Sequence, residues 1–196
     1  MRLAGCLAVK LAEWVKFFRE MEAKGIRVFH VSALKSVSSL DSKALSVALW
    51  RLERRGLIRR VARGWICFGD CSIPEIVKAV FPSAYLSLEW ALHYHEVLDQ
   101  EVRVVTLVWL GKTKVVQSRE YLFELHKIKR ELYFGFNVKD MIAEPEKALL
   151  DLVYFRGKIP PELNLEFIDF SKLAAYAERY PPKVRWLLSL GLHIKS

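Results

Sequence analysis

The stretch that most constrains the fold of this chain is residues 32–69, where two short helical segments precede two strand-like segments. Placed at about 100° per residue, the second helical segment gathers four apolar side chains on one side: Leu45, Ala48, Leu49 and Leu52. The opposite side gathers Lys43, Val47, Trp50 and Arg54, with Ser46 and Arg51 at its margins. This pattern predicts a helix that packs on a core with one side and presents a largely basic side outwards.

The ends of this helix and the segment after it are also specified. Asp41 or Ser42 can cap its start, because a short side-chain oxygen there accepts a free backbone N–H. Gly56 can adopt the left-handed conformation that ends a helix. Residues 57–68 then have strand composition on both sides of Arg63-Gly64, which suits a tight hairpin turn. A basic helix followed by a basic hairpin is the outline of a winged helix-turn-helix, which places the helix in the DNA major groove.

The charge of the chain is unevenly distributed. Residues 1–69 hold 14 Lys and Arg against 5 Asp and Glu, a formal charge of +9. Residues 70–196 hold the other 17 of the 31 basic residues and 17 of the 22 acidic ones, so their formal charge is zero. Most charge runs only keep a surface solvated, but neutralising phosphates requires this kind of local concentration. We therefore predict that the first third of the chain binds nucleic acid.

The residues expected to contact double-stranded DNA lie on the outer side of the helix and in the hairpin: Ser42, Lys43, Ser46, Trp50, Arg51, Arg54, Arg55, Arg59, Arg60 and Arg63. We expect some of the helix residues at base edges and the hairpin arginines at phosphates.

The remaining composition narrows the class of protein. No apolar run reaches the roughly 18 residues that a membrane span requires. Charged residues interrupt the apolar N-terminal stretch at helical spacing, so we interpret it as an amphipathic helix near residues 8–24 and expect a cytoplasmic protein. The three cysteines, Cys6, Cys67 and Cys71, include no pair at two-residue spacing. We therefore expect free, partly buried thiols, and neither a disulfide framework nor a zinc site.

The composition changes after Gly69, which places a domain boundary near residue 70. We predict a winged helix-turn-helix domain at 1–70 and an α+β domain at 71–196. A helix at Pro74–Val80 can belong to either side. Further helices are expected at Ser87–Leu98, Pro145–Phe155, Ser171–Arg179 and Pro182–Leu190, and strands at Val102–Leu110, Tyr121–Ile128 and Glu131–Phe136.

Two clusters in the second region could carry chemistry. His93 and His95 lie two residues apart, which turns them about 200° away from each other on a helix, so we expect packing or surface histidines rather than metal ligands. Around Pro145, the acidic residues Asp140, Glu144, Glu146 and Asp151 with Lys147 could suggest a metal-dependent nuclease. We favour another interpretation, in which the first-turn carboxylates oppose the helix dipole. Lys147 and Asp151 would then pair along the surface. We expect no catalytic residue, no metal and no cofactor.

Three segments, in this order, resemble landmarks of the AbiEi antitoxins of type IV toxin–antitoxin systems: Arg63–Ile66, Tyr85–His95 and Ala143–Asp151. The resemblance covers about residues 30–155, and the run Pro-Glu-Lys-Ala-Leu-Leu-Asp is its most specific part. The chain departs from the family at Trp65 and Cys67, near positions where tyrosine is common. It also departs at Glu96, where the family usually has glycine.

The resemblance implies a transcriptional repressor of its own operon that opposes a nucleotidyltransferase toxin, without requiring a stable complex with it. The alternatives are a stand-alone winged-helix transcription regulator and a metal-dependent nuclease. The residues support the DNA-binding part independently of the resemblance, and they carry no information about the toxin.

Overall fold

The computed structural model describes residues 11–191, which form a mixed α/β structure of two compact units. The first unit comprises Met1–Val80 and Ser118–Glu120, and the second comprises Phe81–Gln117 and Tyr121–Ser196. The first unit thus extends beyond the boundary expected near residue 70. None of the described helices is both long and apolar enough to cross a membrane.

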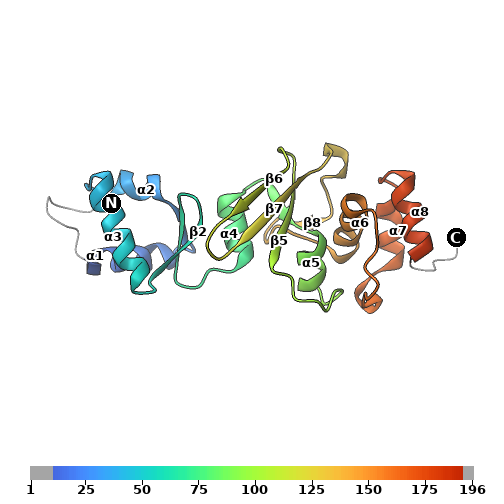
Figure 1. The fold of residues 1–196 in the computed structure, drawn as a ribbon, viewed down its shortest axis with the longest axis horizontal. Helices are drawn as coiled ribbons and strands as arrows, with labels where there is room; N and C mark the ends of the chain where they lie inside the picture. The colour runs from blue at the N-terminus through green and yellow to red at the C-terminus, as the bar shows by residue number, and fades with distance from the viewer. Residues whose placement is uncertain (1–10, 192–196) are drawn as a thin grey trace. The chain divides into compact units, whose positions relative to one another are not determined.

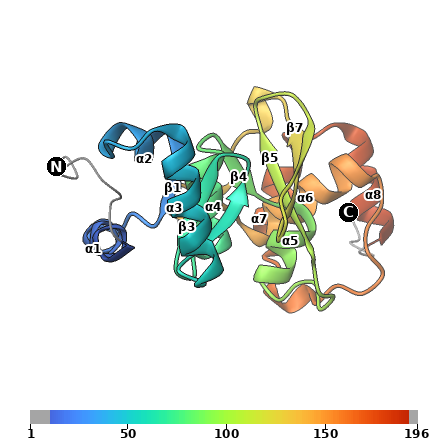
Figure 2. The ribbon, with the colours of Figure 1, turned by 60° about the vertical axis from the view of Figure 1, so that its left-hand side comes forward.

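The first unit combines four helices with a small sheet (Figures 1 and 2). Its elements in chain order are α1 Leu11–Glu22, β1 Val28–His30, α2 Val31–Val37, α3 Ser42–Arg54, β2 Ile58–Ala62, β3 Trp65–Phe68 and α4 Ile73–Val80. The expected helices and the hairpin around Arg63-Gly64 are therefore present. The predicted start of the first helix, residues 8–10, lies outside the described residues.

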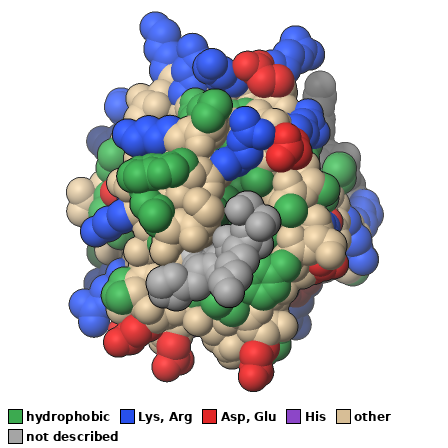
Figure 3. All heavy atoms as spheres, turned by 90° about the vertical axis from the view of Figure 1, so that its right-hand side faces the viewer, with side chains coloured by type: hydrophobic (Ala, Val, Ile, Leu, Met, Phe, Trp, Pro, Cys, Tyr) green, Lys and Arg blue, Asp and Glu red, His purple; other side chains and the backbone are tan. Residues whose placement is uncertain are grey.

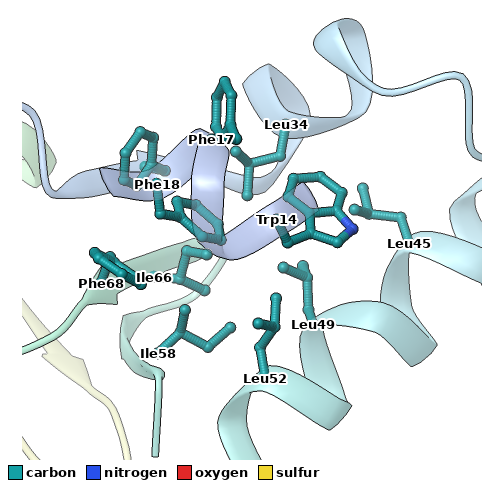
Figure 4. Packing of buried hydrophobic residues seen from close by; sticks show 11 residues of the cluster. Trp14, Phe17, Phe18, Leu34, Leu45, Leu49, Leu52, Ile58, Ile66 and Phe68 are labelled. Carbon is teal, nitrogen blue, oxygen red and sulfur yellow. The ribbon is translucent and has the colours of Figure 1, made fainter. Parts of the chain in front are cut away.

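The core of the first unit is built from the apolar sides of α1 and α3. Trp14 of α1 lies between Leu34 of α2 and the leucines of α3, Leu45 and Leu49 (Figure 4). Phe18 stacks on Phe68 of β3 with ring centroids 5.2 Å apart. Fully burying one such side chain contributes about 1.5–3 kcal/mol, so the apolar side of α3 fixes which of its sides remains outside.

The sheet of the first unit has the order β1-β3-β2, and both pairings are antiparallel. Phe29 of β1 pairs with Ile66 in β3, so the short strand before α2 joins the hairpin. Gly64 has φ +78°, a conformation that L side chains rarely adopt, and it closes the turn between β2 and β3. The hairpin is thereby held against the helices by β1.

The cysteines differ from the expectation of free thiols. Cys67 and Cys71 form a disulfide, with Cα atoms 6.2 Å apart. This separation falls within the range that a disulfide bridges. Spacing alone could not reveal the bond, because the chain turns at Gly69, whose φ is +66°. Cys6 lies outside the described residues.

A second connection attaches α4 to the first unit. The guanidinium of Arg27 donates to both carboxylate oxygens of Glu75, with Nη2 2.6 Å from Oε2. These hydrogen bonds raise the pKa of Arg27. Burial alone would raise the pKa of Glu75, but the hydrogen bonds from Arg27 and Ser72 outweigh it and lower that pKa. Together with the disulfide, this ion pair explains why α4 belongs to the first unit.

The second unit contains a mixed six-stranded sheet and four α-helices among the described residues. Its elements in chain order are β4 Ala84–Leu86, α5 Leu88–Tyr94, β5 Val104–Trp109, β6 Lys114–Gln117, β7 Leu122–Lys127, η1 Arg130–Leu132, β8 Phe136–Asn137, β9 Ile142–Ala143, α6 Pro145–Arg156, η2 Leu165–Phe167, α7 Phe170–Ala177 and α8 Pro182–Gly191. The sheet order is β6-β7-β5-β4-β9-β8, with β5 parallel to β7 and β4 parallel to β9.

Several predicted elements of this unit need correction. The strand expected at Glu131–Phe136 is a 3-10 turn, η1, followed by the two-residue strand β8. The helix expected from Ser87 to Leu98 ends at Tyr94. Ser87 precedes that helix but does not cap it with its side chain, because its hydroxyl donates to Asp151 of α6 instead.

Helix α6 is central to the second unit, since it packs against α5, α7 and α8 (Figure 1). It is buried on most of its circumference, which is typical of a helix in the middle of a domain. Figure 3 views the end of this unit that carries α7 and α8, where apolar and charged side chains are interspersed. The exposed large apolar residues on these C-terminal elements are Phe167, Phe170, Trp186 and Leu190.

Candidate nucleic-acid interface

Both ends of α3 are fixed by hydrogen bonds that the sequence specifies. Asp41 caps the N-terminus, with Oδ1 accepting from the backbone N–H of Ala44 at 2.7 Å. At the C-terminus, the N–H of Leu57 donates to the carbonyl of Leu52, and the N–H of Gly56 donates to that of Glu53. Gly56 has φ +67°. This bonding pattern is a Schellman motif, which satisfies carbonyls that a helix end leaves free.

The predicted contact residues of α3 and its end are all exposed. They are Ser42, Lys43, Ser46, Trp50, Arg51, Arg54 and Arg55. The side opposite them holds Leu45, Leu49 and Leu52, which are no more than 2% exposed. The structure therefore brings the predicted helix residues together on one outward surface, which we call the outer face of α3.

Three of the outer-face side chains have contacts within the helix itself. The guanidinium of Arg54 lies over the indole of Trp50, 5.0 Å from the ring centroid. A cation–π contact at an exposed site contributes about 0.5–1 kcal/mol. The hydroxyl of Ser46 donates to the carbonyl of Ser42 at 2.8 Å, which leaves its oxygen lone pairs able to accept a hydrogen bond.

The hairpin arginines differ in how available they are. Arg63, in the β2–β3 turn, is exposed and forms no ion pair with another described residue. Arg60 donates from Nε to Glu53 of α3 at 2.9 Å, and Arg59 lies 3.1 Å from a carboxylate oxygen of Asp70. Of the three predicted phosphate contacts in the hairpin, Arg63 is therefore the most accessible.

The arrangement presents exposed cationic side chains that a polyanion can contact. Guanidinium and ammonium groups are exposed on one helix and one turn, where phosphates can approach them directly. Among residues 11–191, no group of three or more His, Cys, Asp or Glu is placed to hold a metal ion.

The acidic cluster around Pro145 is not the surface ion pair that the sequence suggested. Lys147 and Asp151 are both fully buried, and Glu146 is 3% exposed. The ammonium of Lys147 donates to Asp151 Oδ1 and to the hydroxyl of Tyr180. The i, i+4 spacing correctly predicted the pair, but its location on the surface was wrong, because α6 is covered on several sides.

Asp151 is the centre of this buried network. Besides Lys147, it accepts hydrogen bonds from Tyr180 at 2.6 Å, from Tyr85 at 3.0 Å and from Ser87 at 2.8 Å. Burial raises the pKa of both tyrosines, and the nearby carboxylate of Asp151 raises it further. Burial lowers the pKa of Lys147 although Asp151 opposes that effect. Asp151 thus has the four donors that a buried carboxylate needs.

Aromatic rings enclose the ammonium of Lys147. It lies 5.3 Å from the ring centroid of Tyr85 and 5.2 Å from those of Phe134 and Tyr180. A Cβ added to Gly135 would come within 3.1 Å of the Lys147 side chain, which shows how closely the backbone covers it. The network is a sealed part of the core and not an accessible catalytic site. Nothing in the sequence indicated Tyr85 and Tyr180 as its members, because they lie far from Lys147 along the chain.

The carboxylates at the start of α6 have separate partners. Glu146 accepts from the backbone N–H of Asp169 at 2.9 Å, and its second oxygen lies 3.5 Å from the ammonium of Lys172. Glu144 accepts from the hydroxyl of Tyr176 at 2.7 Å. The two carboxylates therefore connect α7 and the turn before it to α6. Glu146 lies in the first turn of that helix, as expected, whereas Glu144 is its N-cap residue.

The two histidines at the C-terminal end of α5, His93 in its last turn and His95 at its C-cap, contact backbone carbonyls. Nδ1 of His93 lies 3.2 Å from the carbonyl of Leu98, and Nε2 of His95 lies 2.8 Å from that of Ala143. These contacts hold the loop after α5 and the end of β9, which is a packing role.

No family model and no curated protein matches the chain.

Proposed function

We propose that the first unit is a winged helix-turn-helix that binds double-stranded DNA, with α3 in the major groove and the β2–β3 hairpin against the backbone. The observation that carries the proposal is the outer face of α3, where Lys43, Arg51 and Arg54 are exposed, together with the exposed Arg63 in the β2–β3 turn. The helical connection from α2 to α3 and the sheet-supported hairpin after it have the order that this motif requires.

We further propose that the chain is a cytoplasmic transcriptional repressor and the antitoxin of a type IV system, opposing a nucleotidyltransferase toxin. This part of the proposal rests on the resemblance to AbiEi antitoxins. One feature of the backbone is consistent with it. Glu96 has φ +60°, a left-handed conformation that favours glycine, at the position where that family usually has glycine.

DNA binding is tested with the full chain and labelled duplex DNA across a series of salt concentrations. We expect log affinity to fall linearly with log salt, because Lys and Arg release counterions from the phosphates. Lys43→Ala should weaken binding, whereas Lys158→Ala, an exposed lysine of the second unit, should not. Equal effects of the two substitutions would contradict the assignment of α3.

The antitoxin role is tested in cells. Co-expression of the chain should restore growth to cells that express a nucleotidyltransferase encoded beside its gene. If DNA binding is retained but growth is never restored, the chain is a stand-alone regulator. Cleavage of labelled DNA in the presence of Mg²⁺ would instead support an enzyme.

A further inference from the structure

The middle of the outer face of α3 is apolar, although basic residues surround it. Val47 is 42% exposed and Trp50 is 50% exposed, and both point away from the core leucines. Lys43, Arg51 and Arg54 lie within one helical turn of them. A single exposed apolar side chain needs no explanation. Two neighbouring apolar side chains within a basic face, however, match a ligand that is anionic overall and apolar where it meets them.

The surface around Val47 is also hollowed. A shallow cavity of about 320 Å³ runs along this flank of α3 and is lined by Leu40, Asp41, Lys43, Ala44, Val47, Ala48 and Arg51. Among the lining residues, Ala44 and Ala48 have short side chains and leave space beside Val47. The hollow can therefore admit a small apolar group between two cationic side chains.

Trp50 is prepared for contact because Arg54 lies over its ring at 5.0 Å. A side chain already restrained by a neighbour loses less conformational entropy when a ligand covers it. The pair presents an apolar ring together with a cation, so a ligand that meets it should offer both an apolar group and negative charge.

We propose that Val47 and Trp50 recognise the C5-methyl groups of thymine, so that this protein prefers DNA sites with thymines at defined positions. This inference rests on the proposed DNA-binding function. The thymine methyl is the apolar group that base edges present in the major groove, where apolar side chains contact it. Phosphates on both sides of the groove match the surrounding lysine and arginines in charge.

The basic side chains of the outer face disfavour a second copy of this chain as the partner that covers Val47 and Trp50. A second copy of this chain would bring an identical set of basic side chains against Lys43, Arg51 and Arg54, and like charges in contact are repulsive. An acidic protein segment remains as an outcome that the experiment can detect.

The experiment begins with a duplex selected by the full-length protein from a random library at fixed salt. Each thymine in that duplex is then replaced by deoxyuridine, which removes the methyl group and keeps the base pairing. We expect affinity to fall about threefold to tenfold at one or two positions, as burial of a methyl-sized group predicts. At the same positions, 5-methylcytosine should bind more tightly than cytosine, because these bases differ only by the methyl group.

Two variants assign the effect to residues. Val47→Ala and Trp50→Ala should each abolish the deoxyuridine effect at one position, and alanine is well tolerated in a helix. Val138→Ala is the matched control, because Val138 is 75% exposed in a turn of the second unit. This variant should retain the full deoxyuridine effect.

The outcomes separate this inference from the function on which it rests. Failure to select any duplex would overturn the proposed function itself. Specific binding without any deoxyuridine effect would overturn only the methyl recognition. The same conclusion would follow if Val47→Ala and Trp50→Ala both kept a deoxyuridine effect as large as that of the wild type. Loss of binding to an acidic peptide in these variants, with DNA discrimination intact, would assign the face to a protein partner instead.

Discussion

On α3, the cations Lys43, Arg51 and Arg54 project into solvent, whereas on α6 Lys147 and its partner Asp151 are fully buried. Both helices place a cation beside an aromatic ring, but Arg54 has one exposed ring and Lys147 has three enclosing rings. The exposed arrangement keeps its charge available to a ligand. The buried arrangement uses its charge within the core.

The difference shows that the role of a cation beside an aromatic ring depends on how much of its helix is covered by the rest of the protein. Helix α3 is covered only on its leucine side, so water screens its charges and their removal has little effect on folding. Helix α6 is covered by three other helices, so each of its charges depends on fixed partners. Substitutions of the charges on α6 should therefore affect stability, and substitutions of the charges on α3 should affect affinity.

The largest effect is expected for Asp151→Asn. This change leaves the ammonium of Lys147 buried without its counter-charge, and breaking such a pair typically lowers the free energy of unfolding by about 3–5 kcal/mol. Urea unfolding, combined with hydrogen exchange of α6, measures the loss. Asp140→Asn, at an exposed position, is the control and should leave stability unchanged.

A paired substitution sharpens this test. Replacing both charges, as Lys147→Met with Asp151→Leu, should lower stability less than Asp151→Asn alone, because no uncompensated charge remains. If the double substitution were the more harmful of the two, the network would contribute net stability beyond charge compensation.

The next largest effect is expected for the disulfide. The first unit is stabilised by this covalent bond, whereas the second unit is stabilised by a buried polar network. Reducing the Cys67–Cys71 bond should lower the free energy of unfolding of the first unit by about 2 kcal/mol, as loop closure over a few residues predicts. Thermal unfolding with and without dithiothreitol measures it. The Cys67→Ala, Cys71→Ala double variant should not respond to the reductant, and an equal response would assign the effect to something other than this bond.

A smaller change is expected for Arg63→Ala, which tests whether exposed charge in the first unit serves binding. Because Arg63 forms no ion pair with the described residues, its loss should leave unfolding unchanged, weaken binding to all duplexes alike and reduce the salt slope by about 1. Fluorescence anisotropy at several salt concentrations measures both quantities. A change confined to one DNA sequence would instead place Arg63 at a base edge.

The same comparison explains what the sequence could predict. The course of α3, its caps at Asp41 and Gly56, and the β2–β3 hairpin depend on residues close together in sequence, and all were predicted. The separation of an apolar from a basic side on α3 is also a local pattern. The predicted contact residues on α3 were therefore correctly placed on one exposed face, and their binding to DNA stays a prediction.

The buried network could not be predicted in the same way. A lysine four residues before an aspartate has the same spacing on a surface and in a core. What distinguishes them here is Tyr85 and Tyr180, which lie 66 and 29 residues from Asp151 in the sequence. The two-residue strand β9 was also missed, since two residues carry no measurable alternation and only pairing with neighbours defines it.

The smallest effect is expected for the ion pair between Arg27 and Glu75. This pair is partly exposed, so it is intermediate between the exposed charges of α3 and the buried pair of α6. The pKa of Glu75 in the folded state is below its ordinary value of 4.5. The folded state therefore favours the carboxylate, so this contribution is present above pH 4.5 and is lost as the pH falls through the lowered value.

We accordingly expect Glu75→Gln to lower the free energy of unfolding by less than about 1 kcal/mol at pH 7, because solvent screens a pair at this exposure. The difference from wild type should disappear in acid, when the carboxylate of the wild type is protonated. Urea unfolding at a series of pH values measures this, and Arg27→Gln should remove the same pH dependence. A difference that stayed constant into acid would mean that Glu75 acts through its neutral contacts with Ser72 and not through its charge.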